Sequence, residues 1–282
     1  GQIDAAKGST SASELFVVVR DGARLQADGS QAVLDVPGQG RTLVASNGGS
    51  ISLASANGLY LDGAFSARSG GGGAAGGSLS VALETPYYLK SAVNARVLSV
   101  RELVLKQVAQ ASPLGDTAET SADSLVYGHG QLGIDQVLAG GFDNLSLLSN
   151  GLMSVDGNLS MSLGQSLSLY ARSFGLSATA PANTRVEFNA PHVLLSTATG
   201  LATTRPSFDP YTRPVVEGGG VSLLANKAVF SVNADLLDVQ GNVMFSSKGT
   251  VRQSDDSTVG LERAGFDQVQ LSSRGDLRFL AG

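Results

Sequence analysis

The chain has 282 residues, of which 42% are hydrophobic, 6% aromatic and 15% charged, and it contains 36 glycines but no cysteine and no tryptophan. The absence of cysteine excludes disulfide scaffolds, thiol nucleophiles and thiolate metal sites. The formal net charge of −5, without any cluster of lysine or arginine, argues against binding to nucleic acid or to an anionic membrane surface.

No apolar run is long enough to insert in a membrane as a helix. The first residues, Gly1-Gln2-Ile3-Asp4, do not form a secretory signal. We therefore expect an internal piece of a longer protein whose export is programmed elsewhere.

Short units in which apolar and small polar residues alternate run through the chain. Residues 49–54 read Gly-Ser-Ile-Ser-Leu-Ala and recur as Gly-Ser-Leu-Ser-Val-Ala at 77–82. A period of two indicates strands with one buried face. Further units follow at 159–163, 165–169, 221–223, 229–232, 237–239 and 243–245. Between units, we expect turns with positive φ at Asn57-Gly58, Asp62-Gly63, Asn150-Gly151, Asp156-Gly157 and Gln240-Gly241.

Three segments interrupt this pattern and predict loop insertions. Residues 69–77 are glycine-rich and predict a flexible loop, because they lack the Gly-Lys-Ser or Gly-Lys-Thr of a phosphate loop. Residues 84–120 contain an apolar stretch, 97–108, whose valines favour a strand over a helix. Residues 197–219 hold three of the eight prolines and predict a loop that projects from the domain.

The fold class that best fits these units is all-β, as a right-handed parallel β-helix in one domain over 1–282. Asn-Gly turns also suit antiparallel hairpins, but the units are too short and the aromatic residues too few for most sandwiches. Three short strands would form a coil of about 20 to 25 residues, which gives roughly a dozen coils stacked at about 4.8 Å. A one-residue slip would exchange inward and outward faces, so the register is left open.

Two segments align without gaps. Residues 141–151 read Gly-Phe-Asp-Asn-Leu-Ser-Leu-Leu-Ser-Asn-Gly, and residues 265–275 read Gly-Phe-Asp-Gln-Val-Gln-Leu-Ser-Ser-Arg-Gly. This pattern resembles the carboxyl-side repeats of the filamentous haemagglutinin family, which are two-partner-secretion adhesins. The resemblance covers roughly the second half of the chain, in four stretches: 132–151, 165–171 with 189–193, 233–241, and 265–279.

The resemblance implies a fibre that is secreted to the bacterial surface through a partner outer-membrane pore. It implies a structural or adhesive role in attachment to a host-cell or bacterial receptor or glycan, or in biofilm cohesion. One alternative is the stem or receptor-binding segment of a contact-dependent growth inhibition protein. The resemblance carries no catalytic residue, and no cofactor or metal site is predicted.

A second alternative is a polysaccharide lyase or hydrolase, because these enzymes also use β-helices. Such enzymes need two carboxylates that face one groove. The candidates are Asp116, Glu119 and Asp123, or Asp255 and Asp256 with Lys248 and Arg252 nearby. All lie in polar, loop-like segments, where solvated charge is the preferred interpretation.

Two groups of residues are candidates for binding. Phe208, Tyr211 and Arg213, in the loop 197–219, are of the types that anchor interfaces. Arg274-Gly275-Asp276 is the integrin-recognition tripeptide. The alternative for that tripeptide is a simple turn between strands, as expected for Asn150-Gly151 in the aligned copy.

The two histidines, His129 and His192, have no nearby carboxylate pattern in the sequence and are interpreted as structural. Asn144-Leu145-Ser146 and Asn158-Leu159-Ser160 are formal glycosylation sequons. The alternation of the strands already explains their serines.

Overall fold

The computed structural model describes residues 2–4, 16–55, 57–84, 98–115, 125–197, 222–224, 226–252 and 258–282. These residues are mostly β-strands with one short helix, which confirms the all-β class. The strands of the first half are β1 (Gln2–Asp4), β2 (Phe16–Val19), β3 (Arg24–Gln26), β4 (Gln31–Val36), β5 (Gly40–Ala45), β6 (Ser50–Ser55), β7 (Gly58–Leu61), β8 (Ala64–Ser66), β9 (Gly77–Leu83), β10 (Leu98–Lys106) and β11 (Tyr127–Gly133).

The second half begins with the helix α2 (Ile134–Ala139). The strands that follow it are β12 (Phe142–Val155), β13 (Leu159–Ser162), β14 (Ser166–Leu176), β15 (Arg185–Ser196), β16 (Val229–Gln240), β17 (Ser247–Arg252), β18 (Thr258–Arg263), β19 (Gln268–Ser273) and β20 (Leu277–Leu280). No helix of the described residues is long and apolar enough to cross a membrane.

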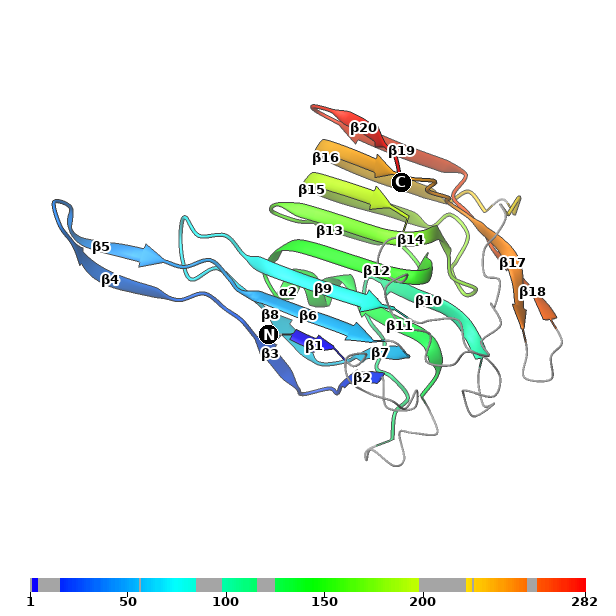
Figure 1. Cartoon of the computed structure of the whole chain (residues 1–282), viewed down its shortest axis with the longest axis horizontal. Coiled ribbons are helices and arrows are strands. Elements are labelled where there is room, and N and C mark those ends of the chain that lie inside the picture. The colour runs from blue at the N-terminus through cyan, green and yellow to red at the C-terminus, as the bar shows by residue number, and fades with distance from the viewer. Residues whose placement is uncertain are drawn as a thin grey trace.

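One sheet of 14 strands dominates the molecule, and its strands lie side by side in Figure 1. Every strand pair in it is parallel. Parallel pairing requires a long connection between neighbouring strands, so hairpins cannot build this sheet. The large parallel sheet therefore excludes the antiparallel arrangement that the Asn-Gly pairs also suggested for these units.

The register of the sheet places apolar residues in continuous rows. The longest row runs through β6, β9, β12, β14, β15, β16 and β20. Its members from Leu53 to Leu195 are at most 1% exposed. The row on the opposite face begins with four serines, as the alternation of the sequence predicts. The apolar row consists of Leu53, Val81, Leu147, Leu169, Leu195, Val239 and Phe279, and the serine row begins with Ser52, Ser80, Ser146 and Ser168.

The strands are longer, and the stacked levels fewer, than the sequence predicted. Including β1, which pairs with β6, eight strands share this row, against roughly a dozen predicted coils. Hydrogen-bonded residues on adjacent levels lie 22 positions apart at Asn144 and Ser166, but 44 apart at Asn189 and Asn233. The number of residues per level therefore differs from one level to the next.

The strand β12 continues through a position where the sequence predicted a turn. β12 has 14 residues and contains Asn150 and Gly151, with a register shift between Ser149 and Leu152. The predicted turn at Asn150-Gly151 is therefore wrong. A Cβ on Gly151 would lie 2.0 Å from the carbonyl oxygen of Arg101, so glycine is needed there for close approach. The prediction of positive φ is confirmed at Gly157 (92°) and Gly241 (74°) and is wrong at Gly58, Gly63 and Gly151.

The two aligned segments of the sequence occupy different rows. Leu145 and Leu147 of the first copy pair with β9 and with the first half of β14. Val269 and Leu271 of the second copy pair with Phe230 and Val232, in the first half of β16. The first copy instead shares its row with the second half of β16. The repeat thus reflects a shared strand pattern and not equivalent positions in the fold.

The order of strands departs from the order of the chain at one place. β11 lies between β7 and β10, although β10 precedes it in sequence. The helix α2 follows directly, buries Ile134 and Val137, and contacts β8 and β13. This helix was not predicted from the sequence.

Two antiparallel hairpins stand outside the large sheet and were also not predicted. β4 pairs with β5, and Figure 1 shows this hairpin extending away from the other strands. β17 pairs with β18. The second hairpin is tied to the sheet by Arg263, whose Nε donates to the Glu102 carboxylate at 3.2 Å.

The predicted loop insertions have different outcomes. Residues 98–106 form β10 inside the sheet, so the strand expected within 97–108 is confirmed and the wider insertion 84–120 is wrong over those residues. Residues 69–76 do connect β8 to β9. Their backbone is held by hydrogen bonds from Gly70 to Ser46 and from Gly76 to the Asp143 carboxylate. The insertion 197–219 lies outside the described residues, apart from its first residue.

Candidate functional site

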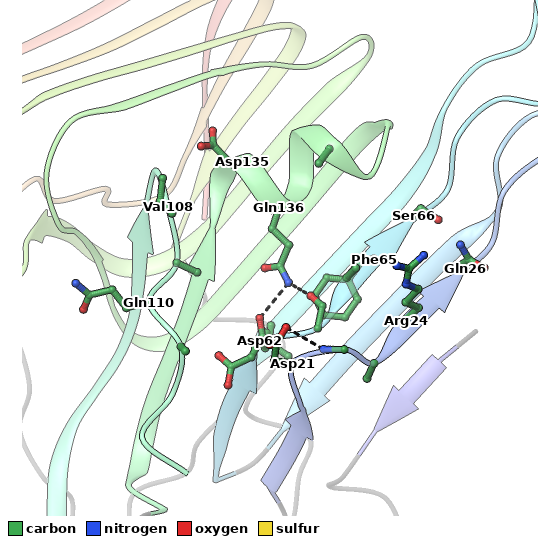
Figure 2. Close-up of a pocket in the computed structure, with 18 of the residues that line it drawn as sticks. Asp21, Arg24, Gln26, Asp62, Phe65, Ser66, Val108, Gln110, Asp135 and Gln136 are labelled. Atoms are coloured by element: carbon green, nitrogen blue, oxygen red, sulfur yellow. Dashed lines mark hydrogen bonds between the residues drawn. The ribbon is translucent and has the colours of Figure 1, made fainter. Parts of the chain in front are cut away.

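A cleft of about 690 Å³ lies beside the amino-terminal levels of the sheet. Its walls come from residues 21–26, around the start of β3, and from 61–68, around β8. The opposite walls are residues 108–111, which follow β10, and the helix α2. Figure 2 shows side chains from all four segments around it. The volume is within the range of small-molecule sites.

Three carboxylates line the cleft, and each of them accepts a hydrogen bond from another group of the protein. Asp62 accepts from the backbone N–H of Ser112 at 3.1 Å and from its hydroxyl at 2.9 Å. Asp135 accepts from the side-chain amide of Gln107 at 2.6 Å. The third, Asp21, accepts from the N–H of Gly22. Fixed carboxylates of this kind act as preorganised hydrogen-bond acceptors.

The helix α2 is positioned against the cleft by an amide and a guanidinium. The Gln136 Nε2 donates to the carbonyl oxygens of Leu61, at 3.0 Å, and Gly63. Arg68 donates to the carbonyl of Ala139 at 2.6 Å. Arg24 and Arg68 line the cleft together with the three carboxylates. The cleft can therefore bind ligands that both donate and accept hydrogen bonds.

Sequence reasoning missed this cleft. Asp62-Gly63 was interpreted as a turn only, and Asp21 and Asp135 were not considered. The three aspartates are far apart in the chain, so nothing in the sequence indicates that they line one cavity. Their proximity depends on how β2, β7 and β11 pair in the sheet.

Most of the residues that were predicted to bind or to catalyse lie outside the described parts of the chain. This is the case for the loop residues Phe208, Tyr211 and Arg213. It is also the case for both acidic groups: Asp116, Glu119, Asp123, Asp255 and Asp256. Lys248 lies on β17, with its Nζ 3.9 Å from the carboxylate of Glu262. The binding and catalytic roles of these residues therefore stay predictions.

The tripeptide Arg274-Gly275-Asp276 forms the bend between β19 and β20 and is exposed. The guanidinium of Arg274 pairs with the Asp235 carboxylate, and its side chain is 84% exposed. The N–H of Gly275 donates to the carbonyl of Asp235 at 2.9 Å, and the carbonyl of Asp276 accepts from Leu237 at 3.0 Å. The tripeptide is thus a turn that rests on β16, while its binding to an integrin stays a prediction.

His192 does have a carboxylate partner, contrary to the sequence interpretation. Its Nε2 lies 3.0 Å from Asp238, which also accepts from Arg278 at 2.6 and 2.7 Å. The Arg278 guanidinium, followed by His192, lowers the pKa of the Asp238 carboxyl to about 2. The three residues come from β15, β16 and β20, so the cluster crosslinks successive levels.

His129 is partly buried near the ring of Tyr60, with ring centroids 6.3 Å apart. Burial lowers the pKa of His129. Asn144 and Asn158, from the two sequons, hydrogen bond to Ser166 and Arg185 of neighbouring strands. These contacts give all four side chains structural roles. Over the described residues, no three His, Cys, Asp or Glu side chains cluster as metal ligands.

Comparisons with known proteins do not assign a family. No family model matches the chain, and neither a curated protein nor a solved structure is significantly similar to it. Functional inference therefore depends on the geometry of the chain itself.

Proposed function

We propose that this chain is a right-handed parallel β-helix that serves as a structural and adhesive segment of a large protein secreted to the bacterial surface. The observation that carries the proposal is the apolar row from Leu53 to Phe279, which stacks strand upon strand in one register. Stability in such a stack adds up level by level, so the architecture supports length without a compact core. An extended, repetitive body suits a stalk.

Two further rows support the β-helix. A second row contains Val17, Leu59, Leu103, Met153 and Phe174, with Gly130 at the level of β11. A third row contains Met161, Phe188, Val232 and Leu271. Three rows of this kind are what three strands per coil produce. β12, β14, β15 and β16 each contribute to two of the rows, because each strand is long enough to continue from one row into the next.

The proposal includes export and attachment. Export through a partner outer-membrane pore and attachment to a host-cell or bacterial receptor or glycan come from the family resemblance. The exposed bend Arg274-Gly275-Asp276 and the loop 197–219 are the proposed contact residues.

The experiment has two arms. Small-angle scattering of the purified chain should fit a stack of eight levels at about 4.8 Å per level, about 34 Å high, and a particle of another height would contradict the stack. Binding to epithelial cells, bacterial cells and glycan arrays should be saturable and should fall when 198–219 is deleted or Arg274 is changed to Ala. The matched control is Arg41→Ala, an exposed arginine on the hairpin β4–β5. Binding to a single outer-membrane protein of neighbouring bacteria would favour the contact-dependent inhibition alternative.

A carbohydrate-active enzyme is the second candidate, and the cleft of Figure 2 favours it. Asp21, Asp62 and Asp135 line this cleft together with Arg24, and a hydrolase needs two carboxylates that face one groove. Release of reducing or unsaturated sugar ends from a polysaccharide panel, lost in Asp62→Asn and Asp135→Asn, would support it. The matched control is Asp35→Asn on the hairpin β4–β5.

A further inference from the structure

We propose that a groove across four levels of the sheet binds a neutral, extended polysaccharide along the stacking axis. The inference deepens the proposed adhesive function by naming the ligand class and the binding surface. The groove has a volume of about 430 Å³ and is separate from the cleft beside α2. It crosses β13, β15, β16 and β19, which are stacked in order in Figure 1.

The centre of the groove is a row of hydroxyl and amide side chains. Strand register places Ser162, Asn189, Asn233 and Ser272 at successive levels. The amide of Asn233 donates to the Oδ1 of Asn189 at 2.9 Å, and Asn189 donates to the hydroxyl of Ser162 at 3.3 Å. Each bond fixes the orientation of the next side chain, so the row is preorganised.

Some hydrogen-bonding groups of the row remain available to a ligand. The amide of Asn189 is occupied, because it also donates to the carboxylate of Glu187 at 3.3 Å. Asn233 uses one N–H in the row and keeps its carbonyl oxygen and its second N–H. The hydroxyls of Ser162 and Ser272 are on exposed residues. The outward surface thus offers both donors and acceptors.

Two small residues lie beside the row. Ala190 and Ala234 are paired in register and are 7% and 6% exposed. Both side chains belong to the hydrophobic core and do not project into the groove, while Pro191 and Arg274 also line it. A ligand can therefore approach the amides closely from one side.

The charges favour a neutral ligand. The only cation that lines the groove is Arg274, and it is paired with Asp235. Glu187 lies beside Asn189 as a second carboxylate. No net positive charge remains to attract sulfated or uronic-acid sugars. An apolar ligand would leave the amides without hydrogen-bond partners, which costs free energy.

The spacing of the row favours a polysaccharide over a peptide. Successive levels are about 4.8 Å apart, whereas an extended peptide repeats its side-chain pattern every two residues, at about 6.6 Å. One pyranose unit is about as long as one level. Successive sugars can therefore each meet one level, and in a (1→4)-linked chain, whose units alternate in orientation, equivalent hydroxyls meet every second level.

The test is titration calorimetry of the whole chain with neutral β-linked gluco-oligosaccharides of increasing length. We expect affinity to increase with each added sugar until the ligand covers the four levels, at about four units, and then to level off. Affinity that does not depend on length would overturn the proposal, as would tighter binding of an oligogalacturonate of the same length.

Two variants locate the site. Asn233→Leu removes the carbonyl oxygen and the second N–H that Asn233 offers at an exposed position, and it should weaken binding about tenfold. Its control is Asn144→Leu, an outward asparagine in a row that already contains a leucine, Leu236. Arg274→Ala, at a side chain that is 84% exposed, tests the groove lining without disturbing the fold. Unchanged affinity in both variants would rule out this groove. A cell-binding protein that has the stacked core but no sugar affinity would overturn only this inference and leave the proposed function standing.

Discussion

The carboxylate of Asp238 on β16 accepts two hydrogen bonds from the guanidinium of Arg278 on β20, at 2.6 and 2.7 Å. The two residues face each other in register on adjacent levels. Asp238 itself is only 4% exposed. A paired charge of this kind joins the last level of the sheet to the one before it.

We expect Asp238→Asn to lower the free energy of unfolding by about 1 kcal/mol at neutral pH. This loss of stability is small, because Arg278 is half exposed and water screens the ion pair. The folded pKa of Asp238, about 2, lies below the ordinary value of 3.8. Its contribution is therefore complete above the ordinary value and is lost as pH falls toward about 2. Urea unfolding of both proteins across this pH range measures the difference, and a difference that persists at the lowest pH would contradict the assignment.

Arg263→Ala should destabilise the protein by about 3 kcal/mol, since it leaves the buried carboxylate of Glu102 without its cation. Glu102 also accepts from the hydroxyl of Ser154, so the carboxylate is held from two strands. The double variant Glu102→Gln with Arg263→Met should recover part of the loss. Additive effects in the double-mutant cycle would show that the pair is not coupled.

Phe230→Ala should cost about 3 to 5 kcal/mol, because it empties the centre of an aromatic cluster. Phe230 is 1% exposed, and the rings of Phe188, Phe245 and Phe266 lie 5.2 to 5.7 Å from it, centroid to centroid. Phe279→Ala is the control, at a side chain that is 74% exposed. Thermal unfolding should separate the two variants clearly, and equal losses would place the cluster outside the core.

Gly151→Ala should destabilise the protein by about 1 to 3 kcal/mol through overpacking inside β12. Its new Cβ would lie 2.0 Å from the backbone oxygen of Arg101, so the backbone of one of the two strands must shift. Gly72→Ala is the matched control, because nothing lies within 4 Å of a Cβ there. The prediction fails if denaturant midpoints of the two variants coincide.

The sequence was most informative where alternation alone determines structure. Ile51 and Leu53 follow a strict period of two, which predicts that both side chains face inward. Both are buried, and they pair with Leu79 and Val81 of the parallel neighbouring strand. The same alternation could not reveal bends, since a strand that turns a corner through Asn150 and Gly151 keeps its pattern. It also could not assign rows, because two segments that align without gaps, 141–151 and 265–275, lie in different rows.

Other features depended on information that is not local. Ile134 and Val137 are too few to indicate a helix, and α2 is fixed by the strands that it packs against. The apolar residues Val33 and Leu43 suggest burial, yet they are 55% and 60% exposed on the hairpin β4–β5. The cleft was unpredictable for a related reason, because its aspartates are brought together only by the pairing of distant strands.

The position of β11 between β7 and β10 limits how the molecule can be assembled. Both neighbours precede β11 in the chain, so a polypeptide that emerges amino end first produces the two borders of a gap before the strand that fills it. Growth by adding one level to the previous level cannot complete this side of the sheet. Residues 98–106 must either wait unpaired on that edge or dock first on β12, which emerges later still. Folding of this region is therefore a cooperative closure that spans about three levels, and it sets a pause in an otherwise sequential process.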